Sequence, residues 1–191
     1  RHTACPFDGV PFTTDEKSRV TSLDHLYNQA TLVSPLLRAK VAALARSLEG
    51  GVEHVTHERG VKSAQRCADK VLMCYRGDVS RVCDAAREKL LFQDLADMAR
   101  CLRCLLYDHE VDVVRVKDRL TTAGQVGTGF RYVLVNLRVH TEEAVALHVE
   151  GHVCELLLVP KELAGLVNAG SHKDSKHFRS SLSHSWGTIH A

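Results

Sequence analysis

The first half of the chain carries apolar residues at spacings of three and four, which is the period of an amphipathic helix. From Leu23 onward this pattern predicts two helices with a break at Ser34-Pro35, because proline disrupts the interior of a helix. Residues 52–61 lack the pattern and are predicted to form a loop. The positions that define the apolar face are Leu26, Ala30, Val33, Leu37, Val41, Leu44 and Leu48.

Two further helices are predicted in the middle of the chain. One runs from Ser63, whose hydroxyl suits a helix N-cap, to Tyr75, and the other covers residues 93–106. The stretch between them, residues 79–92, combines an apolar end typical of a strand with alanines typical of a helix, so both interpretations stay open there.

The second half of the chain changes to β-branched runs, which indicate strands. The predicted strands are residues 111–116, 132–139, 145–149 and 153–159. A glycine-containing loop is predicted over residues 121–129, and a helix over residues 161–167. This order predicts an α+β fold with a mixed sheet of about four or five strands flanked by helices. We expect the domain to cover residues 21–182, between an arm or linker over 1–20 and a tail over 183–191.

The charge balance restricts the classes of partner. The 191 residues include 25 Lys and Arg against 23 Asp and Glu, a formal net charge of +2. A general nucleic-acid binder usually has a strong basic excess, so this balance argues against one but allows a local basic pocket for phosphates. No apolar run approaches the roughly 20 residues of a membrane span, and we expect no membrane partner.

The start of the chain and its cysteines bear on two questions, whether the chain is part of a larger protein and which cellular compartment it occupies. The chain begins with Arg1 rather than methionine and its start is unlike a signal peptide, so we expect it to be part of a larger protein. Its seven cysteines are an odd number, scattered through predicted helices and strands, which is unlike a disulfide framework. We therefore expect a reducing compartment, the cytoplasm.

A basic stripe opens the third predicted helix. Lys62, Arg66 and Lys70 are four residues apart and share one helix face. Ser63 lies beside them at the helix start, where free N–H groups and the helix dipole favour anions. The stripe therefore suits a polyphosphate, and the alternative is an ordinary solvated helix face.

Two carboxylates lie among apolar residues of predicted strands. Asp84 follows Val82-Cys83, and Glu155 follows Cys154. A carboxylate among apolar neighbours is costly unless it binds a cation or a partner, and two converging on one face would hold Mg²⁺. The alternative is that strand alternation points each of them to solvent.

Two features of the second half suit anions or bases. Arg115, Lys117 and Arg119 alternate along a strand and share a face, which predicts either an anion-binding surface or an edge strand guarded by charge. Phe130 follows the glycine loop, where it would be either a stacking platform for a base or a core residue.

The 12 histidines and seven cysteines raise the question of a metal site. Cys101 and Cys104 have the spacing of a zinc pair, but they lie in a predicted helix and no second pair follows at zinc-finger spacing. A zinc-dependent interaction domain therefore stays only as an alternative hypothesis.

Taken in order, these segments resemble the RelA/SpoT-like nucleotide pyrophosphokinase domain, and within that family its divergent single-domain branch. The resemblance covers residues 22–180. The matching segments are Gly60-Val61-Lys62-Ser63 with Arg66 and Lys70, residues 75–87, residues 114–119, residues 129–136, Cys154-Glu155-Leu156 and His172-Lys173.

The resemblance implies an enzyme that moves the β,γ-pyrophosphate of ATP to the 3′-hydroxyl of an acceptor nucleotide or of an RNA end, with Mg²⁺ as cofactor. Asp84 matches the family's metal aspartate, and Glu155 matches the glutamate that binds the metal or accepts the hydroxyl proton. The implied nucleotide-binding residues are Lys62, Ser63, Arg66, Lys70 and Arg87 for ATP, Lys117 and Arg119 for acceptor or transferred phosphates, Phe130 for the acceptor base, and His172 near the phosphates.

The chain departs from the family pattern on the acceptor side. Phe130 lacks the hydroxyl of the usual tyrosine, and Leu157 stands where the family often has glutamine. Residues 140–151 resemble a lengthened hairpin connection. These departures leave an alternative, a catalytically degenerate nucleotide-binding or interaction module of the same fold.

Overall fold

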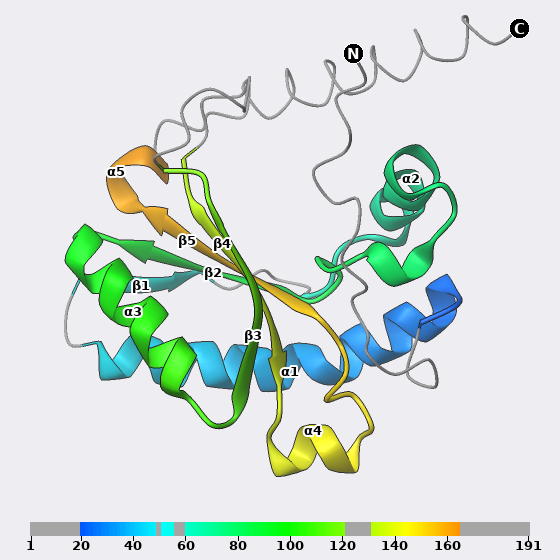
Figure 1. Ribbon diagram of the computed structural model, residues 1–191, viewed down its shortest axis with the longest axis horizontal. Coiled ribbons are helices and arrows are strands. Elements are labelled where there is room, and N and C mark those ends of the chain that lie inside the picture. The colour runs from blue at the N-terminus through cyan, green and yellow to red at the C-terminus, as the bar shows by residue number, and fades with distance from the viewer. Residues whose placement is uncertain (1–19, 49–50, 56–59, 121–130, 165–191) are drawn as a thin grey trace, which may run out of the picture.

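The computed structural model of the chain describes residues 20–48, 51–55, 60–120 and 131–164 (Figure 1). The helices are α1 (Leu23–Ser47), α2 (Ala64–Tyr75), α3 (Leu95–Tyr107), α4 (Glu142–Ala146) and α5 (Lys161–Ala164), with a 3-10 helix η2 (Val79–Arg81). The strands are β1 (Val52–Val55), β2 (Arg87–Phe92), β3 (Val111–Asp118), β4 (Val133–Val139) and β5 (Cys154–Pro160). The arm and tail predicted at the two ends fall almost entirely outside the described residues.

The strands form one mixed sheet in the order β1-β2-β5-β4-β3. Only β2 and β5 run parallel, and the other neighbours are antiparallel. The predicted α+β fold with a mixed sheet of four or five strands is therefore confirmed. Within the described ranges, none of the helices combines the length and the apolar character that a membrane span needs.

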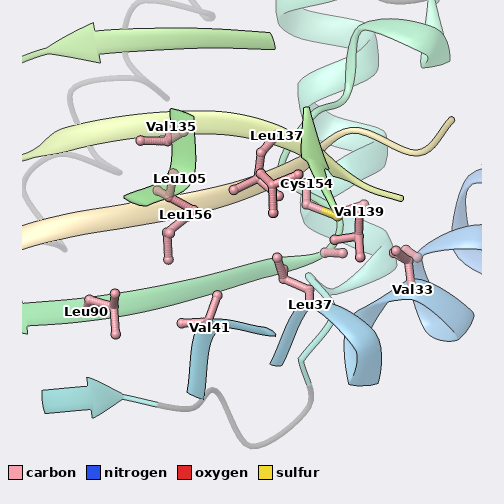
Figure 2. Packing of buried hydrophobic residues seen from close by; sticks show 14 of the residues in the cluster. Val33, Leu37, Val41, Leu90, Leu105, Val135, Leu137, Val139, Cys154 and Leu156 are labelled. Carbon is pink, nitrogen blue, oxygen red and sulfur yellow. The ribbon is translucent and has the colours of Figure 1, made fainter. Parts of the chain in front are cut away.

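The hydrophobic core lies on one face of this sheet, beneath α1 and α3 (Figure 2). Leu37 and Val41 of α1 and Leu105 of α3 pack against alternate residues of the central strands, among them Val135 and Leu156. These side chains are almost completely buried. The side chains on the opposite face of the sheet are available to form a functional site.

The predicted break at Pro35 is wrong, because α1 is a single helix of 25 residues with Pro35 inside it. The missing N–H of proline costs a helix about 3 kcal/mol. Val33 and Leu37, on either side of Pro35, are both buried against the sheet. This packing of the apolar face outweighs the local preference.

Three other segments differ from the prediction or complete it. Residues 52–55 form a strand rather than a loop, because they pair antiparallel with β2. Residues 145–149 are not a strand; the chain forms α4 there, begun by Thr141, whose hydroxyl accepts from the N–H of Ala144 at 3.2 Å. The ambiguous stretch 79–92 divides into η2 and β2.

Candidate nucleotide-binding site

A short backbone pairing brings Lys62 to Asp84. The N–H of Lys62 donates to the carbonyl of Ala85 at 2.9 Å, and the N–H of Arg87 donates to the carbonyl of Gly60 at 3.4 Å. Lys62 therefore precedes α2 instead of sharing its face with Arg66 and Lys70 as predicted. This pairing places the Lys62 side chain in contact with Asp84.

Asp84 is the centre of this site and is 7% exposed. Its Oδ2 accepts from Nζ of Lys62 at 2.5 Å and from Nζ of Lys70 at 3.0 Å. Burial alone would raise the pKa of Asp84, but the two ammonium groups outweigh it and hold that pKa below its ordinary value. Asp84 is thus an ionised carboxylate in a largely water-excluded position.

The second oxygen of Asp84 has no partner. Oδ1 is buried and accepts no hydrogen bond from any of the described residues. A buried oxygen of an ionised carboxylate is costly without a donor or a cation. A divalent cation such as Mg²⁺ prefers carboxylate oxygens of this kind, so the donor set at Asp84 fits this ion.

Asp84 does not lie in a strand, contrary to the prediction. It lies in the connection between η2 and β2, three residues before Arg87 begins the strand. Lys70 reaches it from α2, where its Nζ also lies 5.6 Å from the ring centroid of the buried Tyr75. Burial would lower the pKa of Lys70, and the charge of Asp84 raises it above its ordinary value.

Glu155 lies in β5 as predicted, next to the same connection. Its N–H donates to the carbonyl of Ala86 at 3.0 Å. Burial, and then the negative charge of Asp84, raise the pKa of Glu155 to about 7, although Lys70 and Lys62 act in the opposite direction. The structure therefore brings the two carboxyl groups into one electrostatic environment, which the sequence pattern left open.

Four polar side chains form a row across the sheet. Arg115 of β3 is the register partner of Asn136 of β4, Asn136 is the partner of Glu155 of β5, and Glu155 is the partner of Arg87 of β2. Register partners on adjacent strands project from the same face. This face is opposite to the core face of Val135, so the row lines the side of the sheet away from α1 and α3.

A β-bulge decides that Arg115 belongs to this row. The register of β3 shifts between Val113 and Arg115. Without the shift Arg115 and Lys117 would share a face with Val113, which packs on the core, because side chains alternate along a strand. The extra residue places both cations on the site face instead. The shift is visible in the sequence: valines alternate at 111 and 113, and the alternation then restarts one residue later at 114 and 116.

The other predicted residues are placed less directly. Arg66 lies on α2 one turn before Lys70, and Ser63 occupies the N-cap position of α2, where its side chain makes no capping hydrogen bond. Arg119 follows the end of β3, where its N–H donates to the carbonyl of Tyr132 at 2.9 Å. Phe130 and His172 lie outside the described residues.

Asn136 was not among the predicted site residues, and no nucleotide-binding role was predicted for Arg115. Asn136 is 1% exposed, and its Oδ1 accepts from Nη2 of Arg115 at 2.6 Å. The available signal was a single amide inside the apolar run Val133–Val139, because a buried polar side chain there requires partners.

Two observations bear on which metal this part of the chain would hold. No group of three or more His, Cys, Asp or Glu side chains gathers among the residues that the structure describes. The six cysteines in that part of the chain are free thiols. That the oxygens of Asp84 and Glu155 bind a cation stays a prediction from the sequence.

No protein-family model matches the sequence, and no curated protein matches it. Solved structures of other proteins do share its fold. Small alarmone synthetase 2 from Bacillus subtilis matches with a TM-score of 0.59 at 14% identity, over 87% of this chain and 91% of that one. A GTP pyrophosphokinase family protein from Streptococcus pneumoniae matches with a TM-score of 0.58 at 12% identity, over 87% of this chain and 92% of that one.

A third match is the type VI effector Tas1, solved in complex with its immunity protein. Its TM-score is 0.52 at 20% identity, over 79% of this chain. The chain spans 66% of the length of that effector. These identities are low, so the likeness concerns the fold. The chain therefore has the fold of the small alarmone synthetases and of the RelA/SpoT-like nucleotide pyrophosphokinases.

Proposed function

We propose that the chain transfers pyrophosphate from ATP to the 3′-hydroxyl of an acceptor nucleotide. One observation carries the proposal: Oδ1 of Asp84 is buried and unpartnered, and the charges of Asp84, Lys70, Lys62 and Arg87 act on the second carboxyl group, Glu155. The fold of GTP pyrophosphokinases supports the same activity.

The cations give the site an affinity for a polyphosphate. Lys62, Lys70, Arg87 and Arg115 surround two carboxyl groups, one of which has a pKa near neutrality. Ser63 and Arg66 lie at the start of α2, and we assign them to ATP; Lys117 lies in β3 and Arg119 directly after it, and we assign these two to acceptor or transferred phosphates. Phosphoryl-type transfers depend mainly on alignment and on stabilising phosphate charge, which such a pocket provides.

Asp84 and Glu155 are the residues that would hold Mg²⁺. The ion would neutralise phosphate charge and orient the polyphosphate when bound. Oδ1 of Asp84 would be one ligand. Lys62 and Lys70, which donate hydrogen bonds to Oδ2, keep the carboxylate ionised.

Glu155 would either bind the ion or, where Asp84 holds the ion without it, act as the base. A carboxyl group with a pKa of about 7 exchanges protons efficiently near neutral pH. The acceptor 3′-oxygen would form a bond to the β-phosphorus of ATP, its proton would pass to Glu155, and the bond from the β-phosphorus to the α,β-bridging oxygen would break to release AMP.

The test is transfer of label from [γ-³²P]ATP with Mg²⁺ to GDP, GTP, adenosine nucleotides or tRNA. We expect Asp84→Asn and Glu155→Gln to lower the transfer rate at least about 100-fold, the loss typical of removing one electrostatic group from an active site. Asp69→Asn is the matched control, because Asp69 is an exposed carboxylate on α2 that accepts a hydrogen bond from Nε2 of Gln65 at 2.9 Å.

Binding of ATP by the same proteins separates the two hypotheses. A wild-type protein that binds ATP and transfers label to none of these acceptors contradicts the enzyme and leaves a nucleotide-binding module. A rate that falls in Asp84→Asn but not in Asp69→Asn contradicts the module.

A further inference from the structure

Asn136 is a buried polar residue in the middle of an apolar strand, and all its hydrogen-bonding groups face the candidate site. It is 1% exposed. An amide so deeply buried is costly unless its donors and its acceptor are used. The hydrogen-bond partners of Asn136 therefore indicate which groups it positions.

The amide nitrogen of Asn136 joins two separate segments. Nδ2 donates to the carbonyl of Cys154 at 3.3 Å and to the carbonyl of Cys83 at 3.5 Å. Cys154 directly precedes Glu155, and Cys83 directly precedes Asp84. One NH₂ group thus contacts the residue before each carboxyl group. Both hydrogen bonds are long, so the two together, rather than either alone, form the link.

The amide oxygen of Asn136 holds the neighbouring cation. Oδ1 accepts from Nη2 of Arg115 at 2.6 Å and from Nε at 3.2 Å. The reverse orientation of the amide would set NH₂ against the guanidinium and its oxygen against two carbonyls. The surroundings therefore allow one orientation of this side chain, which connects β3, β5 and the Asp84 connection.

We propose that Asn136 is a positioning residue that fixes the separation of Asp84 and Glu155 and the guanidinium of Arg115 beside them. This inference rests on the proposed function. Catalysis by alignment is sensitive to displacements of about 1 Å, which cost about 100-fold in rate. Backbone pairing already joins Glu155 to the Asp84 connection through Ala86. Asn136 adds a side-chain link from β4 to the residue before each carboxyl group.

The kinetic test uses Asn136→Leu, which keeps the branched shape without hydrogen bonds, and Asn136→Asp, which keeps an acceptor for Arg115 but loses the donor to the carbonyls. We expect kcat to fall at least about tenfold in both, with the KM for ATP changed less than about threefold, because Lys62 and Lys70 are untouched. The control is Val139→Ala, which removes buried volume from the same strand on its core face. We expect it to lower Tm and leave kcat unchanged.

A second measurement follows the geometry without turnover. The amide protons of Lys62 and Glu155 donate to the carbonyls of Ala85 and Ala86, so their hydrogen exchange reports how firmly the Asp84 connection is docked. We expect both to exchange at least about tenfold faster in Asn136→Leu than in wild type, and at the wild-type rate in Val139→Ala.

The outcomes separate this inference from the proposed function. Unchanged kcat in Asn136→Asp, or wild-type exchange of both amides in Asn136→Leu, overturns the role of Asn136. A wild-type protein that transfers no pyrophosphate refutes the proposed function instead, and the exchange measurement then decides the role of Asn136 by itself.

Discussion

The two carboxyl groups of the site show that surroundings, more than residue type, determine protonation. Asp84 is buried and Glu155 half-buried, and the same lysines act on both, but the pKa of Asp84 is lowered and that of Glu155 is raised to about 7. Asp84 accepts hydrogen bonds from Lys62 and Lys70, whereas Glu155 feels these charges only at a distance and is repelled by Asp84. Separation of two carboxyl pKa values is typical of acid–base sites.

His152 makes stability depend on pH. It is 3% exposed, and burial, with a smaller effect of His25, lowers its pKa from 6.5 to about 4. Between these values the unfolded chain binds a proton that the folded protein does not, so the contribution of His152 to stability falls as pH drops from about 6.5 toward 4. Glu155, whose pKa is raised to about 7, acts in the opposite direction, so the difference between wild type and a His152 variant isolates the effect of His152. The loss amounts to about 3 kcal/mol from His152. Urea unfolding at pH 7 and pH 4.5 measures it.

The matched variants are His152→Gln and His109→Gln, because His109 is exposed. We expect the first to reduce the loss of stability at low pH and the second to leave it unchanged. An equal loss in wild type and His152→Gln would show that other groups cause the acid sensitivity.

Burial also separates the cysteines by reactivity. It raises the pKa of Cys83, Cys101 and Cys154 to about 12, whereas Cys74 and Cys104 are exposed. Because the thiolate is the reactive form, we expect iodoacetamide, among these five described cysteines, to modify Cys74 and Cys104 first and Cys83, Cys101 and Cys154 only on unfolding. Peptide mass spectrometry over time checks this order, and early labelling of Cys83 in folded protein contradicts it.

Elements of this fold follow their local patterns except where long-range packing opposes them. α1 continues through Pro35 because residues on both sides are buried, and the bulge in β3 reverses which face carries Arg115. The segment at Gly60 is another such place. Gly60 has φ of +59°, and a Cβ there would lie 2.2 Å from Oγ of Ser34 in α1.

Gly60→Ala therefore tests the docking of this segment. We expect a loss of about 3 kcal/mol or more, because backbone strain and a clash with the buried Ser34 add together. Gly77→Ala is the matched control: its φ is +88°, but nothing lies within 4 Å of the added Cβ. It should cost only the backbone strain, about 1 kcal/mol. Urea unfolding of both compares them, and equal losses would mean that the contact with Ser34 is unimportant.

At the scale of the whole molecule, stability and the candidate site occupy opposite faces of one sheet. α1 and α3 bury one face (Figures 1 and 2). The row from Arg115 to Arg87 lines the other face. Truncations in the core should then affect folding without changing the chemistry.

Leu37→Ala and Leu32→Ala form the matching pair on α1. Leu37 is 1% exposed and Leu32 is 42% exposed. We expect the first to cost about 2–5 kcal/mol and the second less than about 1 kcal/mol. Both should keep the wild-type affinity for ATP at temperatures well below their Tm. A large loss of affinity in Leu37→Ala would show that the two faces are coupled.

The sequence by itself determined the elements whose signals are local. The period of three and four indicated the helical residues of α1, α2 and α3, and β-branched runs indicated β3, β4 and β5. Apolar neighbours marked Glu155 and Asp84 as costly to bury, and the basic residues near α2 followed from their spacing. These signals are local because each depends on a few successive residues.

Only the tertiary structure decided the rest, because each of these features depends on residues distant in sequence. Packing on the sheet carries α1 through Pro35, pairing with β2 makes a strand of residues 52–55, and the bulge turns Arg115 toward the site. Asp84 meets Lys62, 22 residues before it, because Lys62 pairs through its backbone with Ala85, and the side chain of Asn136 reaches Cys83 across 53 residues. The convergence of the two carboxyl groups is a property of these long-range contacts, which no local pattern contains.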